Sequence, residues 1–157
     1  MDKNTSDKNY ISESIVMNEK NIHLMFKNDP FFVKLHWAFQ DMDHYYLVTE
    51  ICVGGSLYNL LSTHDALNEE IIKVYASQII IMLKKIHEKK VIYRDLKPEN
   101  ILIDVHGNLK LADFGLAKIV PELDSLNDTF CGSPEYMAPE MLLGDSHDHT
   151  LDFYTFG

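Results

Sequence analysis

The chain has 157 residues, of which 46% are hydrophobic and 24% charged, and a formal net charge of −10 at pH 7. This length and balance fit one globular domain with its own core and not a disordered or fibrous chain. The acidic charge and scattered lysines argue against a nucleic-acid-binding surface, no apolar run approaches the ~20 residues of a membrane span, and the polar first ten residues lack the apolar core of a signal peptide.

The first element is a helix predicted at 12–26, where Ile15, Ile22 and Phe26 follow helical spacing. Asp29-Pro30 ends it, because the residue before a proline avoids the helical region. Two aromatic and β-branched runs follow at 32–41 and 44–53, and this pattern predicts a β-hairpin.

Gly54-Gly55 breaks the strand pattern, and residues 56–64 predict a short helix. The strongest helix signal spans 68–90, with Asn68 as its expected N-cap. Its predicted apolar face consists of Ile71, Tyr75, Ile79, Met82, Leu83 and Ile86.

Residues 101–104 and 109–113 predict two short strands joined by a turn at Gly107-Asn108. Little between Phe114 and Asp148 is regular, and an irregular stretch of this length inside a domain is usually functional or mobile. Residues 151–157 predict the first turns of another helix.

The chemistry-bearing residues gather near the predicted strands. Asp95, Asn100 and Asp113 carry oxygen ligands of the kind that Mg²⁺ prefers. Lys97 adds a positive charge among them, and carboxylates with a lysine around Mg²⁺ suit phosphate, because phosphoryl transfer depends mainly on positioning and charge neutralisation. The pattern therefore predicts a phosphoryl-transfer site.

Three motifs, "YRDLKPEN" at 93–100, "DFG" at 113–115 and "APE" at 138–140, occur in this order with suitable gaps. Together they resemble the eukaryotic protein kinase family. "NEKNI" around Glu19 resembles its helix C, and "YLVTEICVGGSL" resembles its fifth strand and hinge. "DTFCGSPEYMAPEML" is similar to the activation segment of the AGC group, the cyclic-AMP-dependent kinase and its relatives.

The resemblance implies an α+β, two-lobed kinase fold that is incomplete in this chain. Residues 1–50 would be a remnant of the small lobe with helix C and two strands, 51–55 the hinge, and 56–157 a mainly helical large lobe cut at helix F. The implied function is ATP-dependent serine/threonine protein phosphorylation with ATP and Mg²⁺ as cofactors. The implied partners are a protein substrate and an upstream activating kinase.

The resemblance also implies roles for single residues. Asp95 would accept the proton of the substrate hydroxyl, and Lys97, in its "DLKPEN" context, implies serine/threonine specificity and a contact with the γ-phosphate. Asn100 and Asp113 would hold Mg²⁺.

For the nucleotide, Glu50 and Cys52 would offer backbone groups to adenine. Leu102 would pack beneath the ring and Thr49 would be a small gatekeeper, while Glu19 is the helix C glutamate that pairs with a lysine in the family. For Cys52 and Leu102 the alternative is plain core packing.

Thr129 aligns with the threonine that is phosphorylated in active AGC kinases. Arg94 is the single arginine among the 14 Lys+Arg residues, and a guanidinium pairs with a phosphate through two parallel bonds where an ammonium acts as a point charge. We therefore expect Arg94 to dock a phosphorylated Thr129. The alternatives are an ordinary surface threonine and an arginine spared by chance. Ser133, near Asp95, and Glu99 are assigned to the substrate-facing loops.

The departures from the family limit the function. None of the 18 residues before Glu19 reads GxGxxG, and none is a lysine in an AxK strand. We expect the glycine loop, that lysine and the late helices to lie outside these residues, and the 157-residue chain to be inactive alone. The second hypothesis is a non-catalytic kinase-like binding module. His23 stands where an apolar residue usually joins the family's hydrophobic spine with Leu35, Tyr93 and Phe114.

Other histidine and cysteine residues have ordinary structural explanations. "HDH" at 147–149 resembles a metal site, but its ligands would crowd one short loop with no second segment to close the shell. His87 is expected to be structural, with Asp152 as a candidate partner. Cys52 and Cys131 match no CxxC pattern and predict two reduced thiols in a cytoplasmic protein.

Overall fold

The computed structural model describes residues 3–64 and 66–157, and the side chains from Glu13 onward within these ranges. The first two residues of the predicted small-lobe segment therefore lie outside the described residues. The elements in chain order are α1 (Lys3–Met25), β1 (Leu35–Gln40), β2 (Tyr45–Thr49), α2 (Leu57–Thr63), α3 (Glu69–Glu88), β3 (Val91–Ile92), η1 (Pro98–Asn100), β4 (Ile101–Ile103), β5 (Leu109–Leu111), β6 (Lys118–Ile119), η2 (Pro134–Tyr136), α4 (Pro139–Leu143) and α5 (Thr150–Phe156).

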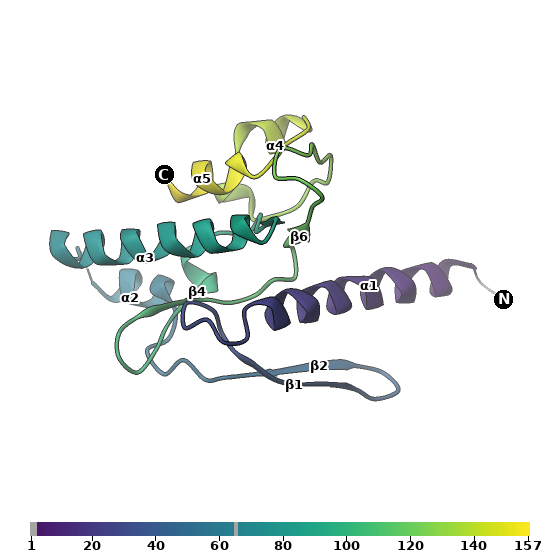
Figure 1. Cartoon of the computed structure of the whole chain (residues 1–157), viewed down its shortest axis with the longest axis horizontal. Helices are drawn as coiled ribbons and strands as arrows, with labels where there is room; N and C mark the ends of the chain where they lie inside the picture. Colours follow the sequence, from purple (N-terminus) through teal and green to yellow (C-terminus); the bar gives the residue numbers. More distant parts are fainter. Residues whose placement is uncertain (1–2, 65) are drawn as a thin grey trace.

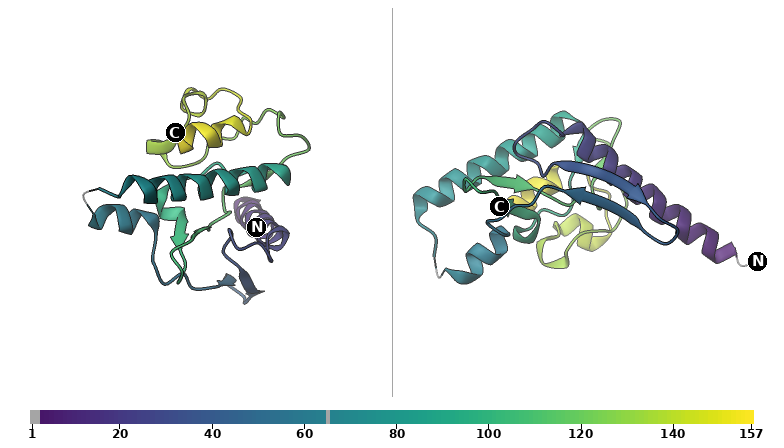
Figure 2. Two further views of the ribbon diagram at one scale, coloured as in Figure 1. Left: turned by 60° about the vertical axis from the view of Figure 1, so that its left-hand side comes forward. Right: turned by 90° about the horizontal axis from the view of Figure 1, so that it is seen from below.

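The predicted α+β fold is confirmed. Helix α1 and the hairpin β1–β2 lie along one side of α3, and α4 and α5 lie along the other (Figure 1). In the described chain the strands form three antiparallel pairs, β1–β2, β3–β6 and β4–β5. Figure 2 shows the hairpin running beside α1 in both further views. This arrangement corresponds to part of the two-lobed fold expected from the sequence.

Helix α1 is longer than the sequence predicts, because it begins at Lys3 and not at residue 12. Its C-terminal part packs into the core through Ile22 and Phe26, whereas Ile15 is 46% exposed. Ile15 therefore shares the predicted helical spacing of Ile22 and Phe26 but not their burial. The helix ends before Pro30, as predicted, and Asp29 Oδ1 accepts a hydrogen bond from the Phe31 amide at 3.1 Å.

Helix α3 is confirmed with its cap, since Asn68 Oδ1 accepts a hydrogen bond from the Glu70 amide at 2.8 Å. Its apolar face is only partly buried. Ile79, Met82, Leu83 and Ile86 lie in the core. Ile71 is 44% exposed, because the side of α3 that meets β3 and β5 is covered and its first turn is not.

The core joins elements that are far apart in the sequence. The main cluster brings Ile22 of α1, Leu83 of α3, Leu111 of β5 and Phe114 into one interior around Tyr93. A second cluster packs Ile92 against residues of α4 and α5. Tyr93 is fully buried, and its hydroxyl donates to the Ala112 carbonyl at 2.6 Å. The loop that begins at Tyr93 is therefore fixed by the core itself.

None of the helices in the described part of the chain is both long and apolar enough to span a membrane.

Candidate active site

The loop at 93–100 is held in place by one buried carboxylate. Asp152, on α5, is 0% exposed and accepts hydrogen bonds from the backbone amides of Tyr93 and Arg94, both at 2.9 Å. It also accepts one from His87 Nε2 at 2.8 Å, as expected from the sequence. Arg94 adopts a left-handed backbone conformation with φ of 66°, which costs a non-glycine residue about 1–2 kcal/mol. The bonds to Asp152 offset that strain.

The residues of this loop converge on Asp95. Lys97 Nζ lies 2.9 Å from Asp95 Oδ2 and donates to Ser133 Oγ at 2.8 Å. The Ser133 hydroxyl in turn donates to Asp95 Oδ1 at 3.0 Å. Asn100 Nδ2 donates to Asp95 Oδ2 at 2.8 Å and to its backbone carbonyl at 3.0 Å. Both carboxylate oxygens of this buried aspartate are therefore oriented by named partners.

The segment that carries Ser133 packs tightly on this loop. Gly132 has a φ of 108°, and a Cβ at this position would lie 2.8 Å from the Arg94 carbonyl oxygen. Only glycine fits this approach without displacing the backbone. The glycine therefore brings Ser133 to Asp95.

Asp113 and Glu19 face the same small space. A Cβ on Gly115 would lie 3.1 Å from Asp113 Oδ1 and 3.9 Å from Glu19 Oε2. Burial, and then the charge of Asp113, raise the pKa of Glu19. Among the described side chains no lysine or arginine pairs with Glu19. The space between these two carboxylates is thus negative.

This donor set fits Mg²⁺ that is bound together with phosphates. Asn100 and Asp113 supply amide and carboxylate oxygens, and Asp113 Oδ1 already accepts a hydrogen bond from the Gly115 amide at 3.0 Å. Within the described residues no group of three or more His, Cys, Asp or Glu side chains could hold a metal ion alone. Mg²⁺ usually keeps one or two carboxylates and takes its other ligands from phosphate and water.

Three residues of the predicted spine, His23, Phe114 and Tyr93, are in contact, and Leu35 is buried. His23 is 4% exposed, and its ring meets Phe114 edge-on with 4.9 Å between centroids. Phe114 meets Tyr93 in the same way at 5.8 Å. His23 Nδ1 lies 3.1 Å from the Val33 carbonyl and donates to it, and burial lowers the pKa of the ring. A neutral histidine thus fills the apolar position.

The predicted adenine-side residues meet at the 50–56 segment. The Glu50 carboxylate accepts hydrogen bonds from Lys110 Nζ and from the Lys34 amide, both at 2.8 Å. Burial raises the pKa of Glu50, but these bonds outweigh it and hold the pKa below its usual value. In the part of the chain that the structure describes, the Cys52 amide makes no backbone hydrogen bond outside the helices and strands. Burial raises the pKa of the Cys52 thiol.

Leu102 lies next to the same segment, because an isolated antiparallel β-bridge pairs its backbone with that of Ser56. Gly54 lies against β4 so closely that a Cβ there would be 2.8 Å from the Ile103 carbonyl oxygen. Thr49 is exposed at the end of β2. Cys52 and Cys131 are both free thiols.

Arg94 and Thr129 are not joined by a hydrogen bond. Arg94 Nε donates to the Leu116 carbonyl at 2.8 Å, and its Nη1 is buried without a partner. Thr129 is exposed, and so is Glu99 of the predicted substrate-facing loop.

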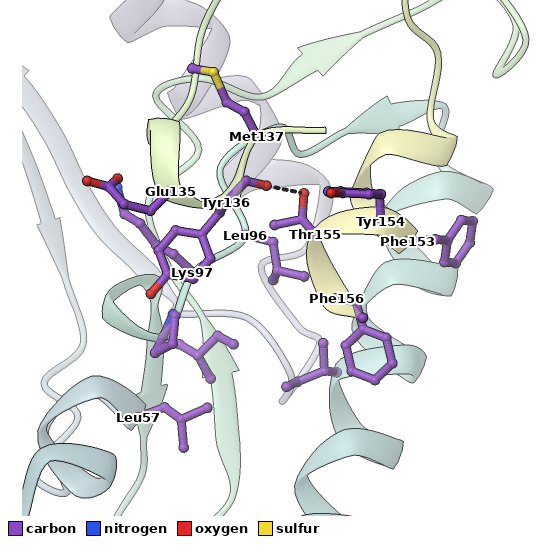
Figure 3. A pocket seen from close by; sticks show the side chains of 14 residues that line it. Leu57, Leu96, Lys97, Glu135, Tyr136, Met137, Phe153, Tyr154, Thr155 and Phe156 are labelled. Carbon is purple, nitrogen blue, oxygen red and sulfur yellow. Dashed lines mark hydrogen bonds between the residues drawn. The ribbon is translucent and has the colours of Figure 1, made fainter. Parts of the chain in front are cut away.

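A cavity of about 760 Å³ lies beside this loop, between η1, η2 and α5 (Figure 3). Lys97 and Glu135 are its charged lining residues, and most of the others are apolar. The cavity is therefore mainly apolar, whereas the charged groups of the loop gather around Asp95.

The three side chains of "HDH" have different partners, although His149 Nδ1 lies 3.9 Å from Asp148 Oδ1. His149 Nδ1 bonds to the Leu123 carbonyl at 3.0 Å, and Asp148 Oδ1 accepts from the Thr150 hydroxyl at 2.6 Å. His147 is buried. Sequence reasoning missed Asn18, whose Nδ2 donates to the Ala117 carbonyl at 2.8 Å and ties α1 to the segment after Gly115. In the sequence, only the position of Asn18 next to Glu19 could have marked it as a site residue.

The sequence matches the protein kinase domain family over residues 1–157, and the chain belongs to that family. Its relatives include protein kinase 2 of Dictyostelium discoideum, which is 43% identical over 128 residues, with 82% of this chain and 26% of the relative covered. Human ribosomal protein S6 kinase alpha-1 is 43% identical over 130 residues, covering 83% of this chain and 18% of the relative. Human serine/threonine-protein kinase Sgk1 is 41% identical over 145 residues, covering 92% of this chain and 34% of the relative.

The predicted resemblance to serine/threonine protein kinases is therefore confirmed. The chain spans between about a fifth and a third of the length of these relatives, given the shares of 26%, 18% and 34%.

Proposed function

We propose that this protein transfers the γ-phosphate of ATP to serine or threonine hydroxyls of a protein substrate. The observation that carries the proposal is the Asp95 carboxylate, which is buried and oriented by Lys97, Ser133 and Asn100 at 2.8–3.0 Å. A base must lie within hydrogen-bond reach of the proton that it accepts, in a fixed orientation. Asp95 meets the orientation requirement before any substrate binds.

In this proposal Asp95 orients the substrate hydroxyl and accepts its proton, and Lys97 holds the γ-phosphate. Asn100 and Asp113 would hold Mg²⁺, which when bound neutralises the charge on the phosphates. The negative space between Asp113 and Glu19 supports this assignment. The Ser133 hydroxyl keeps Asp95 and Lys97 at a fixed separation, because it bonds to both.

Adenine would lie against the 51–55 hinge, between the chain up to residue 50 and the large-lobe part from 56 onward. Glu50 and Cys52 would offer backbone groups to it, Leu102 would pack against the ring, and Thr49 would leave space behind it. The Ser56–Leu102 bridge supports this assignment, because it brings the hinge to β4.

Regulation would come from an upstream kinase that phosphorylates Thr129, with Arg94 as the phosphate-docking residue. The exposure of Thr129 and the unpartnered Arg94 Nη1 support this proposal. Glu99 is exposed and would face a protein substrate. A cytoplasmic location stays a prediction.

The test is phosphate transfer from radiolabelled ATP to a serine/threonine peptide library by the full-length protein, with and without Mg²⁺. We expect Mg²⁺-dependent transfer that falls by at least 100-fold in Asp95→Asn, since removing one oriented group from such a site typically costs about 10²–10³ in rate. Equal activity of this variant and the wild type would reject the proposal. The same assay on residues 1–157 alone tests the prediction that this segment is inactive.

A non-catalytic, nucleotide-binding module is the second candidate. The observation that favours it is Glu19, which has no cationic partner among the described side chains. Calorimetric binding of Mg·ATP without any phosphate transfer by the full-length protein would support this candidate over the first.

A further inference from the structure

Two side chains near the activation segment carry buried hydrogen-bonding groups without partners. Among the described residues, the buried side-chain atoms with no hydrogen-bond partner are Arg94 Nη1 and both ring nitrogens of His147. His147 is 3% exposed. A buried polar group without a partner costs about 1–3 kcal/mol, and such groups in a native fold usually meet a ligand, an ion or water.

These groups come from separate elements, and the charge of Arg94 acts on the His147 ring. Arg94 belongs to the loop after β3, and His147 to the loop between α4 and α5. Burial, and then the nearby charge of Arg94, lower the pKa of His147, and Lys118 of β6 acts in the same direction. Glu140 and the Asp145 backbone act in the opposite direction. The surroundings of the ring thus contain two cations and one carboxylate.

The backbone places Thr129 between the two unpartnered groups. On its N-terminal side, Asn127 forms a bridge with His147, with backbone bonds of 2.8 and 2.9 Å. Ser146 Oγ also donates to Asp128 Oδ1 at 2.6 Å. On its C-terminal side, Gly132 packs so closely on the Arg94 backbone that a Cβ there would lie 2.8 Å from the Arg94 carbonyl oxygen.

We propose that His147 is a second ligand, together with Arg94, for a phosphate monoester on Thr129. This inference rests on the proposed phosphorylation of Thr129 and adds a residue to its receptor. A phosphorylated threonine carries a charge of about −1.5 to −2 at pH 7, more than the single guanidinium neutralises. Protonated His147 adds a positive charge to those of Arg94 and Lys118, and it supplies a ring N–H donor. Docking of the phosphate therefore takes up a proton at the ring.

The inference predicts a measurable change in proton affinity. An opposite charge within ~4–6 Å raises the pKa of a basic group by about 1–3. We expect the protonation constant of His147 to rise at least tenfold when Thr129 is phosphorylated. His149, two residues away and bonded to the Leu123 carbonyl, is the matched control and should change little.

The experiment uses the full-length protein with phosphothreonine genetically encoded at position 129, beside the same protein with threonine. The histidine rings are titrated by ¹H–¹⁵N NMR, and the phosphate by ³¹P NMR. The titration needs no histidine substitution, so a folding defect cannot obscure it. As a second measurement, His147→Phe is compared with His149→Phe for the rate at which a phosphatase removes the phosphate, and we expect about tenfold faster removal for His147→Phe alone.

The outcomes separate this inference from the proposed function. A rise for His147 without a rise for His149 supports the inference. An unchanged His147, together with a phosphate whose ³¹P titration shifts in Arg94→Lys, overturns the role of His147 and leaves the Arg94 contact. If the phosphate titrates as in a free peptide, in wild type and in Arg94→Lys alike, both the role of His147 and the Arg94 contact are overturned.

Discussion

Asp152→Ala is the substitution that most directly tests how the active-site loop is held. The carboxylate of Asp152 is 0% exposed and accepts three hydrogen bonds, from His87 Nε2 and from the amides of Tyr93 and Arg94. Alanine would leave all three donors buried without a partner. The left-handed conformation of Arg94, with φ of 66°, would then lose the bond that offsets it.

The magnitude follows from these contacts. Each buried donor left unpaired costs about 1–3 kcal/mol, and Asp152→Ala removes the acceptor of three donors. We expect Asp152→Ala to lower the free energy of unfolding by about 3–5 kcal/mol, a large part of the ~5–15 kcal/mol of a typical domain. Asp152→Asn keeps one acceptor oxygen but turns an NH₂ group toward a donor. We therefore expect it to lower the free energy of unfolding by about 2–3 kcal/mol.

The assay is urea denaturation of the purified full-length protein, followed by circular dichroism. With a slope of about 2 kcal/mol per molar urea, Asp152→Ala should lower the midpoint by about 1.5–2.5 M. Asp124→Ala, at an exposed acidic position, is the matched control and should leave the midpoint within about 0.3 M. If Asp152→Ala behaved like this control, the claim that Asp152 holds the loop would be refuted.

Three further substitutions test the hinge, the spine and the core. Gly54→Ala would place a Cβ 2.8 Å from the Ile103 carbonyl oxygen, so we expect a loss of about 1–3 kcal/mol in urea denaturation, and an unchanged midpoint would contradict the close approach. Burial lowers the pKa of His23, so the unfolded chain binds the proton more readily, and stability should fall as pH drops below about 6.5. His23→Leu should flatten this part of the melting temperature–pH curve, and an identical slope would disprove that His23 causes the pH dependence. Leu83→Ala, at a fully buried position, should cost about 2–5 kcal/mol, and a loss below about 1 kcal/mol would count against the assigned core.

Local signals in the sequence predicted most of the elements. Asn68, the Pro30 boundary and the Gly107 turn act within a few residues of themselves, and the corresponding ends of α1, α3 and the β4–β5 pair were found where expected. The apolar faces were predicted less well. Ile15 and Ile71 follow helical spacing but are exposed, because spacing defines a face and only the neighbouring elements decide how much of it is covered.

The motifs in "YRDLKPEN" and "DFG" fixed the identity of the candidate site, because the order and chemistry of Asp95, Lys97, Asn100 and Asp113 are properties of the sequence alone. Only the tertiary structure decided what holds them. The bonds from Asp95 to Ser133 and from the loop to Asp152 span 38 to 59 residues. No local propensity encodes such contacts, since they exist only after the core has brought distant segments together.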